Sequence, residues 1–64
     1  MTDDPLVDTR EAARILGVRE GLLVRWRYEQ KGPPYLKLSG GTVRYQIRDL
    51  SAFMESRRVT TNAV

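Results

Sequence analysis

Arginine side chains gather in one short part of this chain, the stretch 17–28, which holds Arg19, Arg25 and Arg27 beside the only tryptophan, Trp26. A guanidinium group carries several N–H donors in one rigid plane. Two of these donors can bond a phosphate, or the edge of a guanine, in parallel. The chemistry that these residue types offer is therefore the binding of a polyanion.

The composition excludes most other kinds of site. The 64 residues include no cysteine and no histidine, which rules out disulfide and thiolate chemistry and removes the commonest general base and zinc ligand. No paired carboxylates, metal-ligand cluster or phosphate-binding loop stands out, so we expect neither an enzyme nor a bound cofactor or metal. No apolar run is long enough to span a membrane and no signal peptide is evident, which predicts a cytoplasmic protein without membrane contact.

Charge is distributed unevenly along the chain. The formal net charge is +3, but three of the eight acids, Asp3, Asp4 and Asp8, lie at the start, so residues 9–64 hold 11 basic and 5 acidic side chains. Such a basic domain suits a polyanion such as DNA. An arginine-rich surface that is simply solvated would have the same composition, and charge alone does not decide between the two.

The elements that must position these arginines begin with two helices joined by a short turn. Apolar spacing predicts a helix over 9–16, with Asp8 as N-cap and Glu11 as its partner in a capping box. Gly17 is expected to end this helix in the left-handed conformation. A second helix is predicted over 20–30, where Gly32 and the two prolines that follow it stop the helix.

Arg19 stands at the expected N-cap of the second helix, where it breaks two local rules. Its side chain cannot accept bonds from the unpaired N–H groups, and its charge lies at the positive end of the helix dipole. A residue that breaks local rules indicates a function elsewhere, here contact with an anion. The alternative is that Arg19 points to solvent and Glu20 offsets the dipole.

Alternating apolar and polar residues predict a hairpin after the second helix, with strands over 35–38 and 43–46 and a tip at 39–42. We call this hairpin the wing. The apolar residues of both strands are expected to share one face: Leu36, Leu38, Val43 and Tyr45. The polar residues expected on the outer face are Lys37, Arg44 and Gln46.

A third helix is predicted over 48–57, with Leu50, Phe53 and Met54 as its apolar stripe. The apolar pair at 6–7 is either a short strand or an anchor on the core. The element order of helix, turn, helix, hairpin and helix is that of a winged helix-turn-helix, an α+β fold that is mostly helical. We expect one domain over 1–64, with its core over about 6–57 and flexible ends.

The side of the second helix that faces away from Leu23 and Trp26 is the candidate recognition surface. Arg25 has the best placement there to read a guanine edge, and Gly21 lets the backbone approach DNA. Glu20 either accepts a bond from a cytosine amino group or offsets the helix dipole.

Two longer side chains lie toward the end of this helix. Tyr28 either touches a phosphate or packs against the wing. Arg27 lies beside the core face, so its stem is expected to cover Trp26 while its head reaches a phosphate.

The tip of the wing has its own binding chemistry. Gly40 and Gly41 make it narrow enough to enter a minor groove. Hydrogen-bond donors that suit phosphate oxygens surround it: Lys37, Ser39, Thr42 and Arg44. The alternative is an ordinary glycine hairpin with solvated charges; beside a cationic helix, we favour contact with DNA.

Three motifs carry a resemblance to a known family. They are Asp8-x-x-Glu11-Ala12-Ala13-x-x-Leu16-Gly17-Val18, Leu23-x-x-Trp26 and Tyr45-x-x-x-Asp49-Leu50-x-x-Phe53. On these motifs the chain resembles the excisionase-type, MerR-like winged-helix domains, which include phage excisionases, also called recombination directionality factors. The resemblance implies a recognition helix in the major groove, a wing in the adjacent minor groove, cooperative binding to repeated sites, and DNA bending. In excisionases these acts direct a phage integrase toward excision.

Carried over by position, the resemblance places four residues at the DNA: Gly21, Leu22, Arg25 and Tyr28. The chain departs from the family pattern where Arg19 replaces a small capping residue and where Gly21-Leu22 replaces residues that are often polar. The predicted DNA contacts of the second helix are then Arg19, Glu20, Gly21, Leu22, Arg25 and Tyr28. Those of the flank and wing are Arg27, Lys37, Ser39, Gly40, Gly41, Thr42 and Arg44.

The resemblance leaves the biological role open. We expect a phage excisionase, a non-enzymatic architectural factor whose partners are double-stranded DNA, an integrase and further copies of itself, since no effector-binding or dimerisation segment is evident. One alternative is a small transcriptional regulator on the same fold. Another is a protein-interaction module that uses Trp26 and the apolar helix faces to bind a partner.

Overall fold

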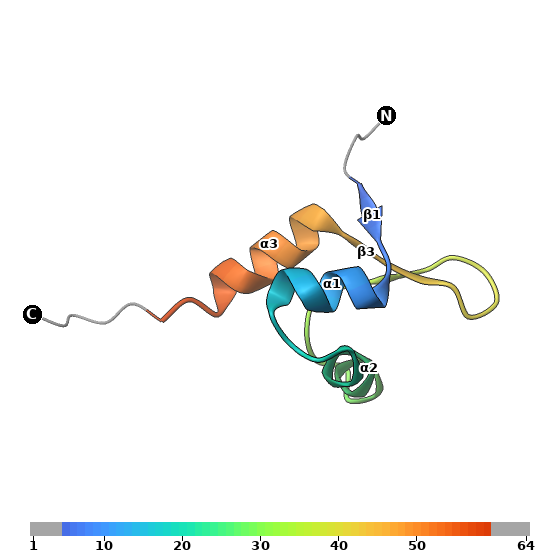
Figure 1. The fold of residues 1–64 in the computed structure, drawn as a ribbon, viewed down its shortest axis with the longest axis horizontal. Coiled ribbons are helices and arrows are strands. Elements are labelled where there is room, and N and C mark those ends of the chain that lie inside the picture. The colour runs from blue at the N-terminus through green and yellow to red at the C-terminus, as the bar shows by residue number, and fades with distance from the viewer. Residues whose placement is uncertain (1–4, 60–64) are drawn as a thin grey trace, which may run out of the picture.

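The computed structural model describes residues 5–59 and has the predicted element order (Figure 1). Its elements are β1 (Leu6–Val7), α1 (Thr9–Leu16), α2 (Glu20–Tyr28), β2 (Leu36–Lys37), β3 (Val43–Gln46) and α3 (Ile47–Ser56). Three helices and a three-stranded antiparallel sheet make a winged helix-turn-helix, as predicted. The expectation of flexible ends falls on residues that, apart from Pro5 and Val59, lie outside the described part of the chain.

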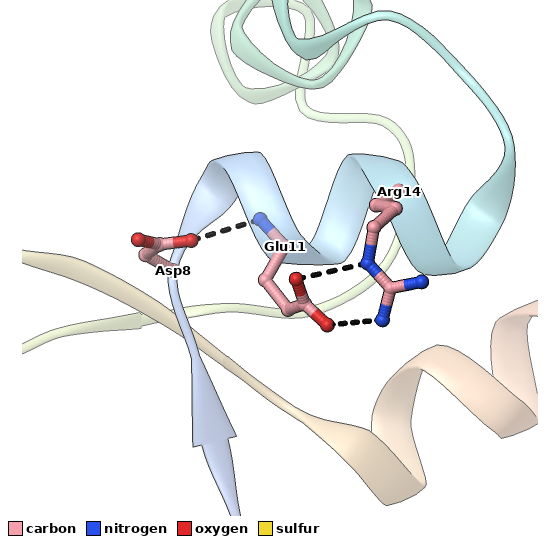
Figure 2. A network of polar contacts seen from close by, with 3 residues as sticks. All are labelled: Asp8, Glu11 and Arg14. Atoms are coloured by element: carbon pink, nitrogen blue, oxygen red, sulfur yellow. Dashed lines mark hydrogen bonds and ion pairs between the residues drawn. The ribbon is translucent and has the colours of Figure 1, made fainter.

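Helix α1 begins at the predicted N-cap. The Glu11 amide donates to Asp8 Oδ1 at 2.8 Å, which satisfies one of the unpaired N–H groups of the first turn. The other half of the predicted capping box does not form, because the Glu11 carboxylate turns forward along the helix and accepts from Arg14 (Figure 2). The Arg14 hydrogen bond holds the pKa of the Glu11 carboxyl below its ordinary value. Gly17 ends α1 with φ of 73°, in the predicted left-handed conformation.

Helix α2 ends at Tyr28, two residues before its predicted end at residue 30. The chain turns at Gln30, which has φ of 57°. The Lys31 amide donates to the Trp26 carbonyl at 2.8 Å and the Gln30 amide to the Arg27 carbonyl at 3.2 Å. This is the Schellman arrangement, in which a left-handed residue closes the helix. The predicted end was wrong because a left-handed residue that closes a helix is usually Gly or Asn, so the sequence pattern places the stop at Gly32 and the two prolines after it.

The wing is part of a sheet with strand order β1-β3-β2. The pair Leu6-Val7 is a true strand, β1, and lies against the far edge of β3, with Val7 opposite Tyr45. Strand β2 is shorter than predicted and covers only Leu36–Lys37. The sheet therefore ties the start of the described chain to the segment that leads into α3.

The predicted faces of the hairpin were wrong. Leu36 lies opposite Arg44, so these two side chains share a face and Leu36 does not join Val43 and Tyr45. Leu38 is 55% exposed. The cause is the tip, where the Thr42 amide donates to the Ser39 carbonyl and the Leu38 amide to the Thr42 carbonyl, both at 2.9 Å. Leu38 is thus paired with residue 42 rather than 43, and a slip of one residue moves a side chain to the other face.

Helix α1 lies at the centre of the domain, with the wing to one side and α3 to the other (Figure 1). The buried core takes residues from every helix and from β3: Ala12, Ala13, Leu23, Tyr45 and Leu50. Burial of a leucine such as Leu23 or Leu50 stabilises the fold by about 2 kcal/mol. Helix α3 begins and ends one residue earlier than predicted, and Met54 of its expected apolar stripe is 41% exposed.

Gly32 generates a test of how tightly Trp26 is packed. Its φ is 81°, and a Cβ on it would lie 2.8 Å from Trp26 Cε3 and 3.1 Å from Trp26 Cβ. We expect Gly32→Ala to reduce the free energy of unfolding by about 2–4 kcal/mol, since it adds overpacking to left-handed strain. Urea unfolding followed by circular dichroism measures this change.

The matched control is Gly17→Ala, because Gly17 also has positive φ, 73°, but open space around its Cβ position. In this variant the free energy of unfolding should fall by only about 1–2 kcal/mol, the cost of the left-handed backbone strain alone. Equal losses in the two variants would show that the Trp26 ring moves aside at little cost.

Candidate nucleic-acid interface

The outward side of α2 is open along its length. Most of the predicted contact residues of this helix are exposed: Arg19, Glu20, Gly21, Arg25 and Tyr28. Leu22 is half-buried and shares a shallow hollow with Val18 and the side chains around it, while Leu23, on the opposite side of the helix, is buried in the core. The helical face that the sequence predicts is thus the one the fold presents to solvent.

Arg19 occupies the N-cap position of α2, as predicted. Its backbone is extended, with φ of −76° and ψ of 145°, and its side chain makes no capping hydrogen bond. Its carbonyl accepts from the Leu22 amide at 3.0 Å, so the backbone starts the helix without help from the side chain. The guanidinium is left for another use at the end of a helix that already attracts anions.

Arg25 is 73% exposed and is held by one neighbour on the same helix side. Its Nε donates to Glu29 Oε2 at 3.0 Å, and the other Glu29 oxygen lies 3.8 Å from Lys31 Nζ. Because this bond engages Nε, it leaves the paired Nη groups for a guanine edge. The ion pair therefore orients the candidate base-reading side chain without covering it.

Arg27 does not have the predicted pose. Its Nη1 donates to the Tyr45 hydroxyl at 2.9 Å and to Thr9 Oγ1 at 3.2 Å. Its Cζ lies 5.7 Å from the centre of the Tyr35 ring. The sequence pattern predicts that its head reaches a phosphate and does not reveal these two acceptors, because a helical wheel shows no groups on other elements; the phosphate contact stays a prediction.

The wing presents its tip beside α2. Gly40, with φ of 57°, lies in an exposed run with Lys37, Ser39 and Gly41. Thr42 and Arg44 are half-buried, and Arg44 Nη1 donates to the Val43 carbonyl at 2.8 Å. The predicted wing residues therefore lie on one projecting hairpin, with the two polar ones nearest the sheet partly covered.

Two hollows separate the wing from the helices, and Arg27 lines both. One is bounded by Tyr28, Tyr35, Lys37 and Gly41. The other is bounded by Glu20, Gly41, Thr42 and Arg44, and also by Arg10 of α1. The fold thus brings the recognition side of α2 and the wing to the same hollows.

Sequence reasoning missed Arg10 and Tyr35 as neighbours of this interface. Arg10 lies in the first turn of α1 and is exposed, and its only sequence signal is a positive charge where a helix start disfavours one. Within residues 5–59, no group of three or more His, Cys, Asp or Glu side chains is placed to hold a metal ion. None of the described helices is long and apolar enough to cross a membrane.

The Arg25–Glu29 pair generates a pH prediction. The hydrogen bond from Arg25 holds the pKa of the Glu29 carboxyl below its ordinary value, against a smaller opposing effect of desolvation. Since the folded-state pKa of Glu29 lies below the unfolded one, the pair stabilises α2 at neutral pH, and this stabilisation is lost as the pH falls through the folded-state pKa. We expect Arg25→Met to raise the Glu29 pKa, measured by NMR titration of the carboxyl carbon.

Lys31→Met is the control for that titration, because the Lys31 ammonium contributes less than Arg25 to the lowered pKa of Glu29. It should raise the Glu29 pKa by less than Arg25→Met does. A Glu29 pKa that is the same in wild type and in Arg25→Met would contradict the pairing.

Comparison with known proteins identifies the family to which nearly all of the described residues belong. No curated protein matches the chain. A family model described as a helix-turn-helix domain matches residues 6–58, from β1 past the end of α3. This model covers α2 and the wing, which carry the exposed arginines and the glycine tip. The chain belongs to the helix-turn-helix domain family, a DNA-binding family that includes excisionase-like proteins.

Proposed function

We propose that this protein is a sequence-specific architectural DNA-binding factor, and that its role is that of a phage excisionase. The observation that carries the DNA-binding part is the exposed side of α2, where Arg25 is 73% exposed and where Glu20 and Tyr28 share hollows with Gly41 of the wing. Family membership supports the same interpretation. The excisionase role rests on the sequence resemblance described above.

In this proposal α2 lies in the major groove. Arg25 reads a guanine through its paired Nη donors, and Gly21, which has open space around it, lets the helix backbone approach the base edges. Leu22 offers an apolar contact such as a thymine methyl, and Glu20 lies where it can accept from a cytosine amino group. Arg19 and Tyr28 flank this surface at the two ends of the helix and bond phosphates.

The wing enters the adjacent minor groove in the same proposal. Gly40 and Gly41 form its narrow tip, since a tip without side chains can go deeper between the two phosphate backbones. Phosphate contacts come from Lys37, Ser39, Thr42 and Arg44. Contact on two grooves at once favours a bent duplex, because bending brings more phosphates to the protein.

We further propose that copies bind side by side on repeated sites and that an integrase is the protein partner. The acids Asp3 and Asp4, one candidate surface for a neighbouring copy, lie outside the described residues. At the other end of the domain, Arg58 bonds Glu55 at 2.8 and 2.9 Å, and Arg57 Cζ lies 4.9 Å from the Phe53 ring centre. Of the two arginines, Arg58 is paired with a carboxylate, whereas Arg57 has no ion pair among the described residues.

The role is tested by selecting binding sites from a random duplex library and then footprinting the protein on the phage attachment region. We expect several protected sites at regular spacing there, and excision by the integrase of the same element should depend on the protein. Excision at an unchanged rate without it would reject the role. Binding near a promoter with altered transcript levels would favour the transcriptional alternative.

The protein-interaction alternative predicts a different result in the same binding assays. Trp26 lines a groove with Leu16, Val18, Phe53 and Met54, on the side of α2 toward α3. Salt-insensitive binding of a protein there, together with no affinity for any duplex, would favour the protein-interaction alternative.

Arg25 and Arg44 make a matched pair of variants that separates base reading from phosphate contact. We expect Arg25→Ala to weaken binding to the selected site by about 1–3 kcal/mol and to relax preference at one base pair. Arg44→Ala should weaken binding to all sequences alike and reduce the salt slope by about one unit. Fluorescence anisotropy over a salt series, on matched and single-mismatch duplexes, measures both. Unchanged discrimination in Arg25→Ala would remove that residue from base reading.

A further inference from the structure

Arg27 connects three parts of the domain through one guanidinium group. Its Nη1 bonds Thr9 at the start of α1 and Tyr45 on β3, while its Cζ faces the ring of Tyr35 in the segment that leads to β2. Tyr35 and Tyr45 are themselves in ring contact, with centres 6.1 Å apart. Arg27 lies on α2 between Arg25 and Tyr28, so these contacts start from within the recognition helix.

The Tyr45 hydroxyl, which accepts the hydrogen bond from Arg27, is held rigidly in place. Tyr45 is 1% exposed and belongs to the core, so its ring cannot change place without disturbing the fold. It directly follows Val43 and Arg44, which begin strand β3 at the base of the wing. A bond between Arg27 and the Tyr45 hydroxyl therefore joins the recognition helix to the base of the wing.

Apolar packing does not make this connection by itself. Helix α2 packs extensively on α1, whereas β3 packs on β1, β2, α1 and α3; an α2–wing contact of that extent is absent among residues 5–59. Trp26 of α2 packs its ring on Phe53 of α3, with ring centres 5.6 Å apart, and so faces α3 rather than the wing. Between α2 and the wing lie the two hollows that Arg27 lines.

We propose that Arg27, through the Tyr45 hydroxyl, sets the distance and angle between the recognition helix and the wing. Arg27 is then a positioning residue for DNA binding and not one of the phosphate contacts. This inference rests on the proposed binding of α2 and the wing to one duplex, since two contact surfaces bind together only when their spacing matches the two grooves. The preset spacing removes the cost of ordering the wing on the DNA.

Tyr45→Phe is the decisive variant, because it removes one buried hydroxyl and no charge. We expect affinity for the selected duplex to fall about two- to tenfold, the range for one buried hydrogen bond. The salt slope should also fall, although no cation was removed, since a displaced wing loses its phosphate contacts. Adding Arg44→Ala to Tyr45→Phe should then cost less than Arg44→Ala costs in wild type.

Tyr35→Phe is the matched control, because it keeps the ring beside Arg27 and leaves the Tyr45 hydroxyl in place. It should bind DNA like wild type. Arg27→Met should reproduce the loss of Tyr45→Phe. A loss in Arg27→Met with none in Tyr45→Phe would instead make Arg27 a direct phosphate contact and overturn the proposal.

A measurement without DNA separates this inference from the proposed function. Residual dipolar couplings of the free protein report the orientation of α2 relative to β3. We expect this orientation to change in Tyr45→Phe while that of α1 relative to α3 stays the same, which also controls for an intact fold. An unchanged orientation overturns the positioning role. Failure of wild type to bind any duplex refutes the proposed function instead, and the couplings still decide the role of Arg27.

Discussion

The close packing of α1 against its neighbours is the contact on which the rest of this small domain depends. Ala12 and Ala13 are buried together with Leu23 of α2, Tyr45 of β3 and Leu50 of α3. Side chains as small as alanine let the surrounding elements approach the α1 backbone closely, so a few larger residues fill the remaining space. Helix α1 packs on α2, α3, β1 and β3, so the placement of these four elements depends on it.

This arrangement keeps charged groups out of the core. No charged or polar side chain is buried among the described residues, and the bonded arginines Arg14 and Arg25 pair with carboxylates of their own helices. Such exposed pairs stabilise the fold only slightly. These ion pairs orient the arginine side chains, and an arginine already held by a carboxylate loses less rotamer freedom when it enters a groove.

Local rules are broken mainly where contact with DNA is proposed. Arg19 stands at an N-cap that it cannot cap, and Tyr28 is 86% exposed at the other end of the same helix. At Asp8 and Gly17 the local signals agree with the fold, whereas Gln30 has a left-handed backbone that its residue type does not indicate. A sequence that follows local rules in its scaffold and departs from them on one face is typical of a domain with its function on that face.

The sequence by itself determined the helices, the turn between α1 and α2, and which face of α2 is exposed. These follow from signals within a few residues of each other: the Asp8 cap, the Gly17 turn, and the spacing of Leu23 and Trp26. Only the tertiary structure decided the hairpin register, the pairing of β1 with β3, the end of α2 at Tyr28, and the bond from Arg27 to Tyr45. Register and hydrogen-bond partners depend on groups far apart in the chain, and a single-residue change in a turn moves them, so no local pattern specifies them.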